Sequence, residues 1–141
     1  KKAGANNFPK AKVVDVLKST STIVDEGGAA AIICEPASGH TDQSLSVVLK
    51  SLASQAVIIG GAILHPTQLH SLNVRGAADF DYVAAIDTRT KLLDRVADSD
   101  TLLVCTNFAS PSRGLVLLDR EKISDYKLDA AAVEEGTAAR R

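Results

Sequence analysis

The uncharged stretch Ala56-Val57-Ile58-Ile59-Gly60-Gly61-Ala62-Ile63-Leu64 indicates the fold class. It is rich in β-branched residues and too short to span a membrane, so it predicts a central strand. Its paired glycines predict a bulge or a close approach of another backbone. A second uncharged run, Ala29-Ala30-Ala31-Ile32-Ile33-Cys34, ends just before Pro36. Continuous apolar runs are typical of strands covered on both faces, so we expect an α/β sheet.

The segment between these runs predicts a helix. Its apolar residues recur at the offsets of a single helical face: Leu45, Val48, Leu49 and Leu52. Thr41 is a suitable N-cap, and Asp42 would lie against the positive end of the helix dipole. Strand, helix and strand therefore form the predicted kernel of the fold.

Helices are also predicted before and after this kernel. Pro9 suits the first turn of a short amphipathic helix that ends near Ser19. Helical periodicity returns after Asp79, in a piece over residues 82–86 and in another from about Asp87. The second piece points Leu92, Leu93, Val96 and Ala97 inward and Arg89, Lys91 and Arg95 outward.

The remaining segments are less regular. His65-Pro66 predicts a turn, and the residues up to Asn73 fit a hairpin or a sheet edge. The apolar segment 101–106 fits a buried strand or a buried helix. Ser110-Pro111 predicts the start of a helix that continues through Leu118.

The composition is that of an ordinary globular domain. The 141 residues are 45% hydrophobic and 23% charged, which is enough to build a core. We expect one compact α/β domain over residues 1–121, with a mixed central sheet flanked by helices, and a helical or frayed tail over 122–141. The sequence lacks methionine, so we expect the gene product to have residues before Lys1. No segment resembles a signal peptide or a membrane helix, and no membrane partner is expected.

Charge and cysteine usage narrow the function classes. The net charge is -1, yet residues 1–18 concentrate lysines, which predicts an anion-binding surface or a solvated end. With three phenylalanines, two tyrosines and no tryptophan, a base-stacking surface is poorly supplied, which leaves phosphate contact as the route to RNA. Cys34 and Cys105 lie in apolar runs, as buried free thiols of a reducing compartment do.

No catalytic or metal-binding pattern stands out in the sequence. Ser38-Gly39-His40 lies between a predicted strand and a predicted helix, where backbone amides could hold a phosphate, but the glycine motifs of nucleotide sites are absent. Ser38 and His40 also lack a nucleophile elbow and an acid partner. His65 and His70, like Glu35 and His40, are five positions apart, which suits neither a helical nor a strand ligand pair. We expect no catalytic site, no metal and no cofactor.

Several stretches match a known family in order and spacing. They are Lys2-Ala3-Gly4, Gly28 before the 29–34 run, Leu45 to Leu52, Gly60 to Leu64, Asp81 to Ile86, Asp87-Thr88-Arg89, and Ser110 to Leu118. Together they cover most of residues 1–118, and the chain resembles the stalk-base protein of the large ribosomal subunit, its protein number ten, in the bacterial and organellar form. The resemblance implies a structural constituent of the ribosome and no enzyme.

The resemblance also implies partners. They would be large-subunit rRNA at the stalk base, the neighbouring ribosomal protein eleven, and dimers of stalk protein twelve, which recruit translation factors and would bind the C-terminal region. The rRNA-binding candidates, by position, are Lys2, Asn6, Asn7, Lys10, Lys12 and Lys18. The family's lysine-asparagine-threonine triplet and paired arginines are missing, and the segment after Leu118 is short. This divergence favours a mitochondrial ribosome, in the matrix, over a bacterial or plastid one.

Other function classes stay open at this point. One is a small α/β ligand-binding or metabolic domain that binds a phosphorylated small molecule through the Ser38-Gly39-His40 connection. Another is a protein-interaction module whose apolar helix faces meet a partner.

Overall fold

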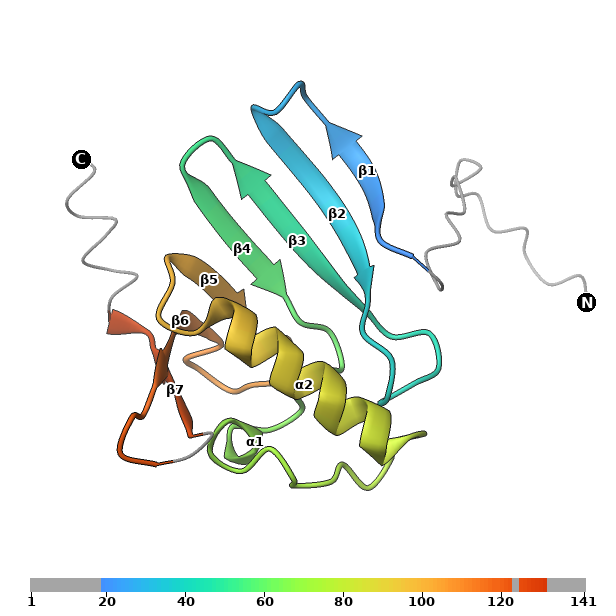
Figure 1. Ribbon diagram of the computed structural model, residues 1–141, viewed down its shortest axis with the longest axis vertical. Coiled ribbons are helices and arrows are strands. Elements are labelled where there is room, and N and C mark those ends of the chain that lie inside the picture. Colours follow the sequence, from blue (N-terminus) through green and yellow to red (C-terminus); the bar gives the residue numbers. More distant parts are fainter. Residues whose placement is uncertain (1–18, 123–124, 132–141) are drawn as a thin grey trace, which may run out of the picture.

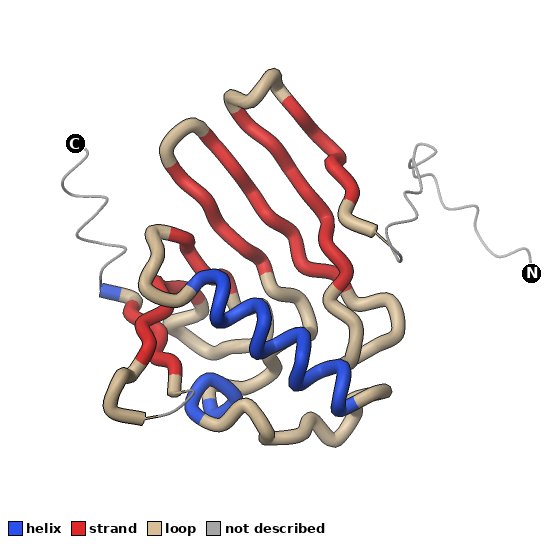
Figure 2. Tube along the Cα trace, in the orientation of Figure 1, coloured by secondary structure: helices blue, strands red, loops and turns tan. Residues whose placement is uncertain are grey.

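The computed structural model describes residues 19–122 and 125–131. The strands are β1 (Ser21–Asp25), β2 (Ala30–Pro36), β3 (Leu45–Ser51), β4 (Ser54–Ile58), β5 (Thr101–Val104), β6 (Arg113–Leu118) and β7 (Tyr126–Asp129). The helices are α1 (Thr67–His70) and α2 (Tyr82–Val96). Within these ranges the strands form one seven-stranded sheet in chain order, and α2 lies in front of it (Figures 1 and 2).

The sheet is mixed, as the sequence predicts, but its kernel is a meander. β1, β2, β3 and β4 pair successively as antiparallel neighbours. β4 and β5 are parallel, and both helices lie in the connection between them, whereas β5, β6 and β7 are again antiparallel. The predicted order of strand, helix and strand is therefore wrong, although the strand predicted over 29–34 is confirmed as β2.

The predicted helix over Leu45 to Leu52 is a strand, β3. Its backbone pairs on both edges, Val48 with Ile33 of β2 and with Val57 of β4. This pairing satisfies the backbone groups that a helix would have bonded within itself, and β-branched valines pack well on a pleated surface. Helical spacing in a short apolar run does not exclude a strand, so Thr41 and Asp42 begin no helix.

The Gly-Gly stretch forms a strand only as far as Ile58, where β4 ends. Gly60 has a φ of +54°, and a Cβ atom there would lie 2.5 Å from the carbonyl oxygen of Leu45. The predicted close approach of another backbone is thus confirmed. Ile59 and Ile63 are buried beyond the strand, so the apolar run continues as a packed loop.

Helix α2 is one continuous helix where the sequence predicts two pieces. Asp81 caps it by accepting hydrogen bonds from the N–H groups of Val83 and Ala84, at 3.0 Å each. The inward placement of Leu92, Leu93 and Val96 is confirmed, since all three are buried. The outward placement of Arg89 is wrong, since its side chain is buried too.

Other expectations are corrected by the same topology. The apolar segment 101–106 contains a strand, β5. The residues after His65-Pro66 form helix α1 and no sheet edge. The segment from Ser110 to Leu118, which was predicted to be a helix, contains strand β6. β7 lies where a helical tail was predicted, because its residues pair with β6. The predicted helix from Pro9 lies almost wholly outside the described residues.

The core lies between one face of the sheet and the two helices. Val48, Val57, Leu103 and Val116 of the sheet pack with Leu69 of α1 and with Leu92, Leu93 and Val96 of α2. Helices on both sides of the sheet are not observed in the described ranges, which corrects the expectation of a helix-flanked sheet. Cys105 is buried, as predicted, whereas Cys34 on the other face is half-buried. Neither helix of the described ranges has both the length and the apolar character needed to span a bilayer.

Candidate functional site

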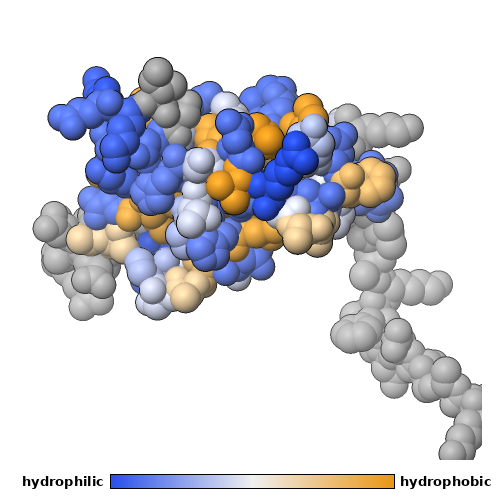
Figure 3. Space-filling view, turned by 90° about the horizontal axis from the view of Figure 1, so that it is seen from below, coloured by the Kyte–Doolittle hydropathy of each residue, from blue (hydrophilic) through white to orange (hydrophobic). Residues whose placement is uncertain are grey.

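Three connecting segments meet at one edge of the sheet. β2 and β4 point the same way because each is antiparallel to β3, and β5 is parallel to β4. The segments that leave their carboxyl ends carry Ser38-Gly39-His40, Gly60-Gly61 and Thr106-Asn107. The carboxyl edge of parallel strands is where many α/β proteins bind ligands. Seen from below, the molecule is largely polar with scattered apolar patches (Figure 3).

A histidine and an aspartate pair at this edge. His40 Nδ1 lies 3.1 Å from Asp79 Oδ1, and the two side chains are 26% and 3% exposed. The other carboxylate oxygen of Asp79 accepts a 2.8 Å hydrogen bond from the N–H of Gly76. Asp79 is therefore held on both oxygens, and it orients an imidazole that solvent can reach.

The backbone ties His40 to the start of α2. The N–H of Phe80 donates to the carbonyl of His40 at 3.2 Å, and the N–H of Asp81 donates to the carbonyl of Gly39 at 2.9 Å. Gly39 has a φ of +133°, and a Cβ atom there would lie 2.3 Å from the Cα of Ala85. Only glycine fits between the strand connection and the helix, so the position of His40 depends on this contact.

The loop after β4 lies beneath the histidine ring. A Cβ atom on Gly61 would lie 2.7 Å from Cδ2 of His40, so glycine leaves room for the imidazole. Thr106 Oγ1 and Asn107 Nδ2 donate to the carbonyl of Gly60, at 3.0 and 3.2 Å. The segments after β2, β4 and β5 thus form a single connected unit.

Arg89 supports this unit from inside the protein. Its guanidinium donates to the carbonyl groups of Ala62, Leu72 and Val74, at 3.3, 2.5 and 3.1 Å. Burial lowers the pKa of Arg89, and the nearby charge of Asp79 raises it in part. Arg89 falls on the apolar face of α2. Its spacing from the apolar residues of that face is the sequence signal that could have predicted its burial.

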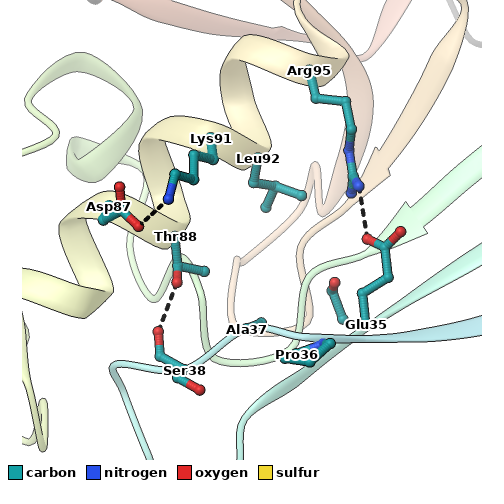
Figure 4. Close-up of a pocket in the computed structure, with 10 residues that line it drawn as sticks. Glu35, Pro36, Ala37, Ser38, Asp87, Thr88, Lys91, Leu92 and Arg95 are labelled. Atoms are coloured by element: carbon teal, nitrogen blue, oxygen red, sulfur yellow. Dashed lines mark hydrogen bonds and ion pairs between the residues drawn. The ribbon is translucent and has the colours of Figure 1, made fainter. Parts of the chain in front are cut away.

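A groove runs beside the edge, between the end of β2 and α2. It has a volume of about 330 Å³ and lies along Glu35, Ser38, Ser46 and the helix residues from Asp87 to Arg95 (Figure 4). Arg95 pairs with Glu35 at 2.7 Å, and Lys91 pairs with Asp87 at 2.6 Å. The charged side chains of the lining are thus paired, and Pro36, Ala37 and Leu92 add apolar surface to it.

The structure places the sequence candidates differently from the prediction. Ser38-Gly39-His40 leads into β3 and no helix, so it offers no helix N-terminus to a phosphate; the first amides of α2 are occupied by Asp81. His65 bonds locally to Thr67, and His70 pairs with Asp125 at 2.6 Å. The predicted rRNA-binding residues Lys2, Asn6, Asn7, Lys10, Lys12 and Lys18 all lie outside the described residues, and their roles stay untested.

Residues 19–122 and 125–131 contain no group of three or more His, Cys, Asp and Glu side chains placed to hold a metal ion. His40 and Asp79 pair with each other, and Gly61, which has no side chain to act as a ligand, lies against the His40 ring. The described residues therefore do not by themselves fit a metal centre.

Comparison with solved structures identifies the fold. AbOPH, a hydrolase in the β-lactamase superfamily, matches with a TM-score of 0.64 at 21% identity, over 75% of this chain and 35% of that chain. AidC, a dizinc quorum-quenching lactonase in complex with its product N-hexanoyl-L-homoserine, matches with a TM-score of 0.63 at 16% identity over the same shares. No protein-family model and no curated protein matches the chain.

The chain therefore has a fold found within β-lactamase-superfamily hydrolases, and it spans about a third of the length of these two structures. The resemblance to ribosomal protein ten is wrong, because the sheet is a meander of a different fold class. The same comparison contradicts the expected partners, which were rRNA and ribosomal proteins eleven and twelve. It also contradicts the expectation that the protein is not an enzyme. The mitochondrial location was inferred from that resemblance and stays untested.

Proposed function

We propose that the chain forms part of a hydrolase that acts on small esters, lactones among them. The observation that carries this proposal is the His40–Asp79 pair at the edge where β2, β4 and β5 end. A partly exposed imidazole oriented by a buried carboxylate is the usual arrangement of a general base. The similarity to AbOPH and AidC supports the same reaction class.

The chemistry follows from the two ring nitrogens. The N–H at Nδ1 of His40 donates a hydrogen bond to Asp79, which leaves Nε2 to take a proton from a water molecule. The resulting hydroxide attacks the carbonyl carbon of the ester, and the C–O bond to the leaving oxygen breaks. His40 then returns the proton to that oxygen, so a lactone gives a hydroxy acid. Asp79 stabilises the imidazolium without taking its proton.

AidC carries two zinc ions, and the described residues of this chain do not provide an equivalent ligand set. The proposal therefore assigns the proton transfer to His40 and Asp79 and routes no step through a metal.

The test is hydrolysis of N-hexanoyl-homoserine lactone and of p-nitrophenyl acetate by the purified chain. We expect His40→Gln to lower kcat/KM by about 100-fold or more and Asp79→Asn to lower it by a smaller factor, as for general bases and the groups that orient them. His70→Gln is the matched control, because His70 forms a similar pair with Asp125 away from the edge. An unmodified chain no faster than His40→Gln contradicts the proposal.

A second candidate function is the binding of a small phosphorylated molecule in the groove beside α2. Ser46 favours it, because this buried side chain lines the same groove as Arg95. Glycerol 3-phosphate should then raise the melting temperature more than glycerol does, and Arg95→Gln should abolish the difference. Equal effects of the two compounds would exclude this candidate.

A further inference from the structure

Residues 59–62 form a tight turn at the edge where His40 lies. The N–H of Ala62 donates to the carbonyl of Ile59 at 3.1 Å, which places Gly60 and Gly61 at the two central positions of the turn. The N–H groups of these two glycines have no hydrogen-bond partner among residues 19–122 and 125–131. Both glycines are only half-buried, so a small ligand can reach their backbone.

The peptide group between Gly60 and Gly61 is held in one orientation. Its carbonyl oxygen accepts hydrogen bonds from Thr106 Oγ1 at 3.0 Å and from Asn107 Nδ2 at 3.2 Å. The peptide bond is trans, and in a trans peptide the N–H points away from the C=O. The N–H of Gly61 therefore points away from the segment after β5, and two donors on the carbonyl fix its direction.

The reactive nitrogen of His40 lies next to the same turn. A Cβ atom on Gly61 would lie 2.7 Å from Cδ2 of His40, and Cδ2 is bonded directly to Nε2. Nδ1, which is not bonded to Cδ2, pairs with Asp79. Nε2, which takes the proton from water in the proposed hydrolysis, is thus on the side of the ring next to Gly61. A carbonyl group that this water attacks would lie within reach of the Gly61 N–H.

Attack on an ester carbonyl creates a negatively charged oxygen. The water oxygen bonds to the carbonyl carbon while its proton moves to Nε2 of His40, and an electron pair moves from the C=O double bond to the carbonyl oxygen. The return of that pair breaks the bond to the leaving oxygen, which takes the proton from His40. A backbone N–H placed at the carbonyl oxygen stabilises the intermediate more than the substrate, because a charged acceptor forms the stronger hydrogen bond.

We propose that the N–H of Gly61 forms the oxyanion hole of this hydrolysis, with Thr106 and Asn107 as the residues that position it. The inference rests on the proposed function, because the oxyanion is the one produced by the water that His40 activates. It assigns the site to acyl compounds, whose hydrolysis passes through a tetrahedral oxyanion.

The test compares a stable tetrahedral anion, hexylphosphonate, with heptanamide, a planar and neutral amide of matched chain length. Calorimetry measures the binding of each to the full chain. Thr106→Val combined with Asn107→Leu releases the carbonyl of Gly60, so the peptide group can rotate. We expect this double variant to bind hexylphosphonate at least about tenfold more weakly and heptanamide within about twofold of the unmodified chain.

Hydrolysis of p-nitrophenyl acetate gives a second readout of the double variant. Its kcat should fall by about tenfold or more with little change in KM, because the charge develops only in the transition state. Thr90→Val is the matched control. It removes a hydroxyl that donates to the carbonyl of Ile86 within α2, at 2.8 Å, and it should leave kcat and both binding constants unchanged.

Two variants of Gly61 test the N–H group itself. Gly61→Ala and Gly61→Pro both place a Cβ atom against His40, but only proline removes the N–H. Hexylphosphonate should bind Gly61→Pro at least about tenfold more weakly than Gly61→Ala. Circular dichroism checks the fold of each variant, and the double variant decides the question where Gly61→Pro does not fold.

The outcomes separate this inference from the proposed function. An unmodified chain that does not bind hexylphosphonate, or a double variant that binds it equally tightly, would overturn the inference. Hydrolysis that depends on His40 but not on Thr106 and Asn107 would also overturn it, while the proposed function stands. Binding of hexylphosphonate that the double variant loses, in a chain that hydrolyses no ester, would support the anion site at Gly61 and contradict the proposed function.

Discussion

Nδ1 of His40 lies 3.1 Å from Oδ1 of Asp79, although 39 positions separate the two residues. The connection between β4 and β5, which contains both helices, brings them together. Because a carboxylate accepts hydrogen bonds and donates none, the neutral ring of His40 should carry its proton on Nδ1. His65 provides the opposite case, since its Nδ1 accepts from the N–H of Thr67 at 3.2 Å.

The histidine tautomers are therefore predictable. Nitrogen-15 NMR of the neutral rings should show His40 protonated on Nδ1 and His65 protonated on Nε2. Asp79→Asn should weaken the preference of His40 and leave that of His65 unchanged. Identical tautomers for the two rings would contradict the geometry on which the proposed general base depends.

Gly39 and Gly28 test the packing between the site and α2. Both have positive φ, but a Cβ atom on Gly39 would meet the backbone of Ala85, whereas none lies within 4 Å of one on Gly28. Gly39→Ala should cost about 3 kcal/mol or more in free energy of unfolding, and Gly28→Ala only about 1 kcal/mol. Urea unfolding measures both, and equal losses would contradict the close contact.

Arg89 should be more important for stability than the other arginine of α2 that the sequence predicts to point outward. Arg89→Met would leave the carbonyl groups of Ala62, Leu72 and Val74 without this donor, at a cost of about 3 kcal/mol. Arg95→Met removes only a partly exposed ion pair with Glu35 and should cost less than about 1 kcal/mol. Thermal and urea unfolding of the two variants would reveal the difference, and similar losses would refute it.

The two thiols should differ in reactivity. Burial raises the pKa of Cys105 to about 12, so at pH 8 only about one thiol in ten thousand is ionised. Iodoacetamide should modify Cys34 in the native protein and Cys105 only after denaturation, as peptide mass spectrometry can show. Modification of native Cys105 at a comparable rate would contradict its burial.

Acid should weaken the contact between α1 and the segment that leads into β7. The hydrogen bond with His70, and then that with Lys122, lowers the pKa of Asp125. A lowered pKa means that Asp125 stabilises the fold above about pH 4, which is the pKa of an aspartate in the unfolded chain. This contribution is lost as the pH falls through the lowered pKa of the folded state. Asp125→Asn should therefore destabilise the protein more at pH 7 than at pH 2, as urea midpoints would show. A loss that is equal at both values would contradict the assignment.

The local sequence was sufficient for some elements. Strand β2 follows from an uncharged β-branched run before a proline, and the apolar stripe of α2 follows from its 3.6-residue spacing. The close approach at Gly60 follows from a glycine pair in an apolar run, and the burial of Cys105 follows from its neighbours. Each of these features depends on residues a few positions apart.

Tertiary structure decided the rest. The segment from Leu45 has apolar residues at helical offsets, yet it is a strand because β2 and β4 pair with both of its edges. The residues that form β6 likewise become a strand because β5 and β7 lie beside them. A short apolar run can satisfy its backbone hydrogen bonds either as a helix or as a strand. The presence of neighbouring strands that can pair with it decides which of the two forms. The pairing of His40 with Asp79 depends on that choice too, because only the observed strand order brings the two segments to one edge.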